Sequence, residues 1–163
     1  MKHRKEKKII FIDMDGVLAD FGERVRQVEA TLGKRHGDKV DEISFVFRDL
    51  NPVDGAVEAV KKLHQSGMYD LYIASTSPWE NLTALQDKKD WIEKHLGDIF
   101  HKKVIFSHNK HLLRGDYLID DRLKNGADRF KGELLRFGVD HETGKLNAFP
   151  DWDSILKYLI KDE

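Results

Sequence analysis

The sequence predicts an α/β fold, in which a Rossmann-like parallel sheet has helices on both faces and carries a small helical cap insertion. Two observations predict it. Short, continuous apolar runs rich in β-branched and aromatic residues recur along the chain, which is typical of strands buried on both faces. Segments with apolar residues three or four positions apart lie between these runs and indicate helices. This alternation favours a parallel sheet with right-handed crossovers.

The apolar runs define the expected strands. Four are clear, at residues 9–12, 71–74, 104–106 and 117–119, and a weaker one spans 134–137. The longest unbroken run, at 9–12, is far shorter than the roughly 20 apolar residues of a membrane-spanning helix. We therefore expect a buried sheet and no membrane segment.

Three helices are expected to cover the sheet. Val57, Val60 and Leu63 share one stripe of a helix at about 53–65, and Gly67 follows as its stop signal. A second helix is expected at about 82–96. A third closes the chain from about residue 152, where an aspartate at 151 or 153 would cap its start.

Residues 21–50 interrupt the alternation. The segment begins with apolar residues at helical spacing and follows the first strand directly, where a cap over an active site would lie. We therefore expect a single domain over residues 1–163. Its core would comprise 1–20 and 51–163, and its cap 21–50.

Charge and cysteine content exclude several classes of function. The chain has 28 Lys and Arg against 29 Asp and Glu, a net charge of −1, which disfavours a general nucleic-acid binder. Because cysteine is absent, disulfide scaffolds, thiol nucleophiles and cysteine-ligated zinc are excluded. The expected setting is a reducing cytoplasm. The basic run at 2–8 is interpreted as a solvated tail before the first strand.

Polar residues follow the predicted strands. They are Asp13 and Asp15 after the first strand, Thr76 and Ser77 after the second, Lys110 after the third, and Asp120 and Asp121 after the fourth. Open α/β sheets bind ligands at the carboxyl ends of their strands, so we expect these side chains to share one site. Taken singly, each motif has a simpler explanation, such as a turn, a helix cap or a surface lysine. Their order at successive strand ends favours the shared site.

The four aspartates at this edge would repel one another. Two carboxylates about 4 Å apart repel by roughly 4 kcal/mol at an intermediate dielectric, so a cation is expected to neutralise the group. Oxygen ligands without cysteine favour Mg²⁺. Its expected ligands are Asp13, Asp120, Asp121 and the carbonyl oxygen of Asp15.

The same residues suit phosphoryl transfer through a covalent intermediate. Asp13 would attack phosphorus as the nucleophile and form an aspartyl-phosphate. Asp15 would protonate the leaving alkoxide and later take a proton from the hydrolytic water. Thr76, Ser77 and Lys110 would bind the phosphoryl oxygens.

These motifs resemble those of the haloacid dehalogenase-like (HAD-like) hydrolase superfamily. Its four motifs match Asp-Met-Asp-Gly-Val-Leu-Ala-Asp at 13–20, Thr76 after an apolar strand, Lys110, and the Asp-Asp pair at 120–121. Phosphatases and phosphotransferases of the superfamily carry the second aspartate of the first motif, Asp15, and dehalogenases lack it. The resemblance therefore implies a phosphatase.

A narrower resemblance is to the 5′(3′)-deoxyribonucleotidase family. It is carried by residues 13–21, by Ser-Thr-Ser-Pro at 75–78 and by Leu-Ile-Asp-Asp-Arg at 118–122. The resemblance implies Mg²⁺-dependent removal of a 5′- or 3′-phosphate from nucleoside monophosphates. The insertion at 21–50 is shorter than the cap expected from that family, which leaves the base and sugar preference open.

Aromatic residues beside the predicted site could hold a base. Phe21, Phe45 and Trp79 are the candidates, and the alternative is that they pack the cap against the core. Other functions stay open. They are a phosphatase of another small metabolite such as a sugar phosphate, a phosphatase of nucleic-acid ends, and a binding protein that keeps the site without turnover. A homodimer is also compatible with the sequence.

Overall fold

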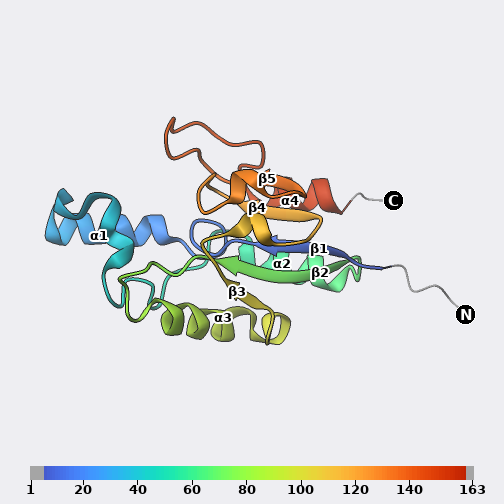
Figure 1. Ribbon diagram of the computed structural model, residues 1–163, viewed down its shortest axis with the longest axis horizontal. Coiled ribbons are helices and arrows are strands. Elements are labelled where there is room, and N and C mark those ends of the chain that lie inside the picture. The colour runs from blue at the N-terminus through green and yellow to red at the C-terminus, as the bar shows by residue number, and fades with distance from the viewer. Residues whose placement is uncertain (1–5, 161–163) are drawn as a thin grey trace, which may run out of the picture.

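The computed structural model describes residues 6–160, without the side chains at 35–38, and contains a five-stranded parallel sheet (Figure 1). The strands are β1 (Lys8–Ile12), β2 (Tyr69–Ser75), β3 (Val104–Phe106), β4 (Tyr117–Asp120) and β5 (Glu133–Arg136). Their order across the sheet is β3-β2-β1-β4-β5, and every pairing is parallel. The predicted α/β fold class is confirmed. Residues 2–5 of the basic run lie outside the described residues.

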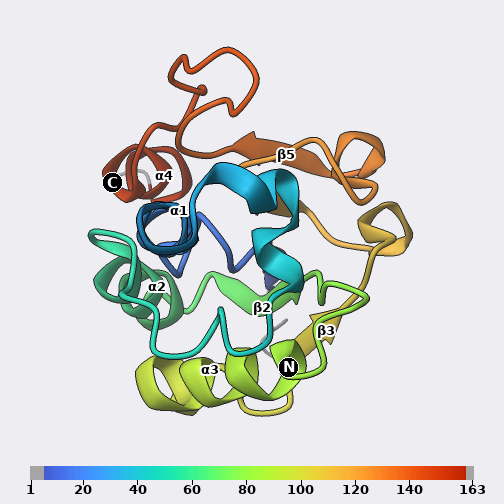
Figure 2. The same ribbon diagram turned by 90° about the vertical axis from the view of Figure 1, so that its left-hand side faces the viewer.

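The helices α2 (Ala56–Gln65), α3 (Ala84–Phe100) and α4 (Trp152–Leu159) pack on one face of the sheet (Figure 2). They bury the main core against Ile10 and Ile12 of β1. Helix α2 starts later than predicted because Gly55 before it has a left-handed backbone. Helix α3 bends at Leu96 and continues to its end at residue 100, beyond the predicted stop.

The opposite face is covered more thinly. Two short 3₁₀ helices, η2 (Lys110–Leu112) and η3 (Ala127–Arg129), lie there over a small cluster that includes Phe11 of β1. The direction of the chain explains this division. From β1 to β3 successive strands are added on one side of β1, and β4 and β5 are added on the other side. Right-handed crossovers therefore place the two sets of connections on opposite faces.

The segment between β1 and α2 extends beyond the carboxyl ends of the strands (Figures 1 and 2). It contains α1 (Phe21–Leu32) and the 3₁₀ helix η1 (Lys34–Glu42). The side chain of Asp20 caps α1 by accepting a hydrogen bond from the Glu23 amide at 2.8 Å. No residue of α1 is fully buried, because this helix packs against little besides η1 and the edge of the core.

Asp151 caps α4, one of the two caps that the sequence predicts. Its carboxylate accepts a hydrogen bond from the Ser154 amide at 2.8 Å, and the two residues form a capping box. Within residues 6–160, no helix combines the length and the apolar character that crossing a bilayer requires.

Candidate active site

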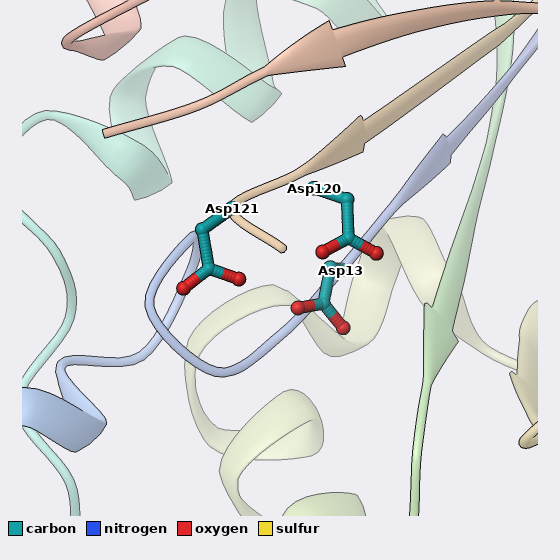
Figure 3. Close-up of side chains that lie close together, drawn as sticks. All are labelled: Asp13, Asp120 and Asp121. Carbon is teal, nitrogen blue, oxygen red and sulfur yellow. The ribbon is translucent and has the colours of Figure 1, made fainter. Parts of the chain in front are cut away.

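Three carboxylates meet at the carboxyl edge of the sheet (Figure 3). Asp13 directly follows β1, Asp120 ends β4, and Asp121 follows it. One oxygen of each carboxylate lies within 4.8 Å of the others. They converge because β1 and β4 are neighbours in register, with Ile12 beside Ile119. The sequence-based expectation of a shared acidic edge thus matches the geometry.

Lys110 lies between two of these carboxylates. Its Nζ donates to Asp13 Oδ1 at 2.9 Å and to Asp120 Oδ2 at 2.6 Å. The lysine is buried at the start of η2, and its backbone amide donates to the Asn125 carbonyl at 2.8 Å, which fixes that turn. One buried ammonium therefore bridges the ends of β1 and β4.

Burial and mutual repulsion dominate the electrostatics of the group. Burial, with a smaller contribution from the neighbouring carboxylates Asp120, Asp121 and Asp15, raises the pKa of Asp13 to about 8, against the opposing effect of the Lys110 ammonium. Burial also raises the pKa of Asp120. The pKa of Lys110, which burial would lower, is raised because Asp13 and Asp120 favour its charged form. The Lys110 ammonium thus serves two of the three carboxylates, Asp13 and Asp120.

This excess of negative charge suits a cation. The donors are carboxylate oxygens alone, which is the ligand set of a hard ion such as Mg²⁺. They follow or end β1 and β4, which are neighbours in the sheet, so the backbone fixes their spacing before any ion binds. The acidic triad Asp13, Asp120 and Asp121 can therefore hold a divalent metal.

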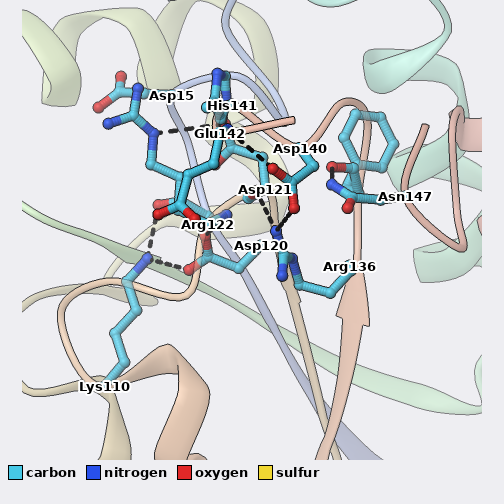
Figure 4. A network of polar contacts seen from close by, with 12 residues as sticks. Asp15, Lys110, Asp120, Asp121, Arg122, Arg136, Asp140, His141, Glu142 and Asn147 are labelled. Atoms are coloured by element: carbon cyan, nitrogen blue, oxygen red, sulfur yellow. Dashed lines mark hydrogen bonds and ion pairs between the residues drawn. The ribbon is translucent and has the colours of Figure 1, made fainter. Parts of the chain in front are cut away.

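Two residues that were not among the predicted site residues, His141 and Arg122, flank Asp121 (Figure 4). His141 Nε2 lies 2.7 Å from Asp121 Oδ2, and Arg122 Nε lies 4.0 Å from the same oxygen. His141 stands on a loop after β5, and no strand-end pattern could have indicated it. A Cβ at Gly16, whose φ is +77°, would come within 2.5 Å of this oxygen, so the turn after β1 needs glycine.

Asp15 has a partner that the sequence analysis also missed. Its Oδ2 accepts a hydrogen bond at 2.6 Å from Nζ of Lys88, a fully buried residue of α3. A signal was available in the sequence. Lys88 lies three and four positions before Trp91 and Ile92 and so belongs to the inward stripe of that helix.

Thr76 follows β2 and faces the site. It lines the cavity described below, and its hydroxyl donates to the Ser107 carbonyl at 3.3 Å. Ser77 is half-buried and does not line that cavity. Of the two predicted hydroxyl residues, Thr76 alone therefore reaches the site among the side chains described here.

A cavity of about 650 Å³ opens beside the carboxylates. The core supplies the aspartates, Lys110 and Thr76 to its floor, and the segment 21–42 supplies one wall. Two of the predicted aromatic residues, Phe21 and Trp79, line it. Phe21 stacks on the buried Phe47 with 4.9 Å between the ring centroids, and Trp79 is 83% exposed.

Phe45 does not line the cavity, contrary to the sequence-based expectation. Its backbone φ of +68° turns the chain, and its exposed ring packs under the guanidinium of Arg48 at 4.4 Å. Helical or extended spacing does not apply across such a turn, so the sequence could not place this side chain.

Comparisons with known proteins indicate the family of the chain. The family described as 5′ nucleotidase, deoxy (Pyrimidine), cytosolic type C protein matches residues 34–148. A Vibrio phage KVP40 protein, named provisionally as a 5′(3′)-deoxyribonucleotidase, is 40% identical over 159 residues, covering 98% of this chain and 88% of its own. The human cytosolic-type 5′(3′)-deoxyribonucleotidase is 31% identical over 174 residues, covering 90% and 78%.

One solved structure supports the fold. A haloacid dehalogenase-like family hydrolase from Xanthomonas campestris superposes with a TM-score of 0.58 over 90% of this chain and 91% of its own. The two sequences are 14% identical, so this likeness bears on the architecture alone.

Proposed function

The chain belongs to the 5′(3′)-deoxyribonucleotidase family, and from that premise we propose that it is a Mg²⁺-dependent phosphatase of deoxyribonucleoside monophosphates that acts through an aspartyl-phosphate. One observation carries the proposal. Asp13 meets Asp120, Asp121 and a buried lysine, Lys110, on the floor of a cavity large enough for a nucleotide. The Lys110 ammonium and a cation held by the aspartates would attract a phosphoryl group, and the rest of the cavity has room for a nucleoside.

In the first step, a carboxylate oxygen of Asp13 attacks phosphorus. A bond from this oxygen to phosphorus forms as the bond from phosphorus to the nucleoside oxygen breaks. Asp15 gives a proton to that departing oxygen, which leaves as a nucleoside hydroxyl. Lys110, 2.9 Å from Asp13, and Thr76 at the cavity floor bind the phosphoryl oxygens.

In the second step, water attacks the phosphorus of the aspartyl-phosphate. Asp15, now a carboxylate, takes a proton from this water. The bond between phosphorus and Asp13 breaks, inorganic phosphate leaves, and both carboxyl groups return to their starting forms. Mg²⁺ held by Asp13, Asp120, Asp121 and the Asp15 carbonyl would offset charge on the phosphoryl oxygens.

The cap and the base pocket belong to the same proposal. Residues 21–50 form a cap on the core of 1–20 and 51–163 and close one side of the cavity. Phe21, backed by Phe47, and Trp79 offer aromatic surfaces against which a base can stack. A cytoplasmic setting is part of the proposal and is supported by the cytosolic type of the human relative.

The test is phosphate release from 5′- and 3′-deoxyribonucleotides, ribonucleotides, sugar phosphates and p-nitrophenyl phosphate, with Mg²⁺ or EDTA. We expect Mg²⁺-dependent release from deoxyribonucleotides that is lost in Asp13→Asn. Asp98→Asn, a change at an exposed position near the end of α3, serves as the matched control. Release from sugar phosphates alone would overturn the substrate class. Absence of release from every compound would overturn the proposal.

A further inference from the structure

Lys88 is a charged side chain that the two chemical steps leave unused. It is fully buried in the second turn of α3. A buried ammonium is strongly unfavourable unless hydrogen bonds and an opposite charge compensate it. Its Nζ has three oxygen partners, and their positions are informative: Asp15 Oδ2 at 2.6 Å, the Thr76 carbonyl at 2.6 Å and Ser75 Oγ at 3.1 Å.

The three partners of Lys88 come from the ends of two neighbouring strands. Asp15 lies in the turn after β1, and Ser75 and Thr76 lie at the end of β2. One ammonium therefore fixes the proposed proton donor relative to the turn that binds the phosphoryl group. The distance between these two groups must be held closely for proton transfer to the departing oxygen.

The two oxygens of the Asp15 carboxylate differ. Oδ2 is occupied by Lys88, whereas Oδ1 is buried without a hydrogen-bond partner among residues 6–160. An unpartnered buried acceptor is costly, and a substrate oxygen that shares a proton with Oδ1 would relieve that cost. Lys88 thus holds one oxygen and leaves the other for proton exchange.

An aromatic contact links Lys88 to the cap. Its Nζ lies 4.3 Å from the ring centroid of Phe47, a cation–π arrangement, and Phe47 stacks on Phe21 at the cavity wall. The segment 21–50 therefore contacts the ammonium through Phe47.

We propose that Lys88 is a positioning residue for Asp15, which it holds in place for proton transfer to and from the substrate. The inference rests on the proposed function. It differs from a purely structural role, in which Lys88 only fills the space between α3 and the sheet. A structural role would affect all substrates alike.

The test compares leaving groups. A nucleoside oxygen needs a proton to depart, whereas p-nitrophenolate leaves well without one. We expect Lys88→Met to lower kcat for a deoxyribonucleotide by about 10- to 100-fold. The pre-steady-state burst of p-nitrophenol should change by less than about threefold. Asp15→Asn should show the same selectivity. Lys89→Met, at the exposed neighbouring position that pairs with Glu93, should behave as wild type.

Equal losses with both substrates would overturn the inference and leave the proposed function intact. An inactive wild-type protein would instead remove the proposed function itself. If Lys88→Met does not fold, Asp15→Asn is compared with the double variant Asp15→Asn/Lys88→Met, in which no buried charge is left unpaired. Equal rates are expected because Lys88 acts through Asp15, and a further loss in the double variant would contradict the inference.

Discussion

Lys110 and Lys88 bring one buried ammonium each to opposite sides of the same acidic edge, and they come from different kinds of structure. Lys110 starts a short 3₁₀ helix after β3 and bonds to Asp13 and Asp120. Lys88 lies in the second turn of a long helix and bonds to Asp15. Lys110 is thus beside the proposed nucleophile and metal, and Lys88 is beside the proposed proton donor.

This difference suggests a division of labour. Groups that contact the phosphoryl oxygens should matter for every phosphomonoester, because each substrate carries the same phosphoryl group. A group that acts through the proton donor should matter most when the departing oxygen is basic. The two lysines can therefore be told apart by substrate, although each neutralises a carboxylate at a similar distance.

Lys110→Met should have the largest effect after loss of the nucleophile. We expect kcat to fall by about 10²- to 10³-fold with both a deoxyribonucleotide and p-nitrophenyl phosphate, because a charge that stabilises the phosphoryl oxygens is lost. Lys103→Met removes a partly exposed ion pair with Asp70 and is the matched control. If kcat fell for the deoxyribonucleotide alone, Lys110 would behave as expected for Lys88, and the proposed division between the two lysines would be wrong. Circular dichroism checks the fold of each variant.

The sequence placed Lys110 and missed Lys88 for a physical reason. Parallel strands end at one edge, so residues that follow β1, β2, β3 and β4 within a few positions are brought to that edge, and Lys110 is the one that follows β3. The burial of Lys88 depends on how α3 is rotated against the sheet. His141 depends on a loop after β5, and Phe45 on a backbone turn with positive φ. Periodicity carries no information about such loops.

The raised pKa of Asp13, the carboxylate beside Lys110, predicts that stability depends on pH and that Mg²⁺ changes this dependence. Because the pKa of Asp13 rises to about 8 on folding, from an ordinary value near 4, the metal-free native state favours its protonated form. This contribution to the free energy of unfolding is present below about pH 4 and is lost as the pH rises to about 8. The slope for one such group is at most about 1.4 kcal/mol per pH unit.

Mg²⁺ needs the ionised carboxylate, so its stabilising effect should grow as the pH rises. We expect the Mg²⁺-induced increase in Tm to be a few degrees larger at pH 8 than at pH 6. Thermal melts with Mg²⁺ or EDTA at each pH measure this increase in Tm. In Asp13→Asn the increase should be the same at pH 6 and pH 8. A larger Mg²⁺ effect at pH 6 would contradict the charge balance described for the site.

The smallest effects are expected at the cap, where two phenylalanines provide the contrast. Phe21 lines the cavity, and Phe45 is turned away from it against Arg48. Stacking of a base on an aromatic ring contributes about 1–3 kcal/mol, so Phe21→Leu should raise KM for a deoxyribonucleotide by roughly 5- to 100-fold. It should leave KM for p-nitrophenyl phosphate within about twofold, since that substrate carries no base.

Phe45→Leu should change neither KM by more than about twofold, because its ring is 53% exposed and lies outside the cavity wall. A rise in KM for the nucleotide in this variant would show that the cap rearranges on binding and brings Phe45 to the base. The cation–π contact between Phe47 and Lys88 would then change with the cap as well. Lys88 would in that case couple base binding to the position of Asp15. Phe45→Leu should then lower kcat for the nucleotide by a larger factor than it lowers the rate of the p-nitrophenol burst.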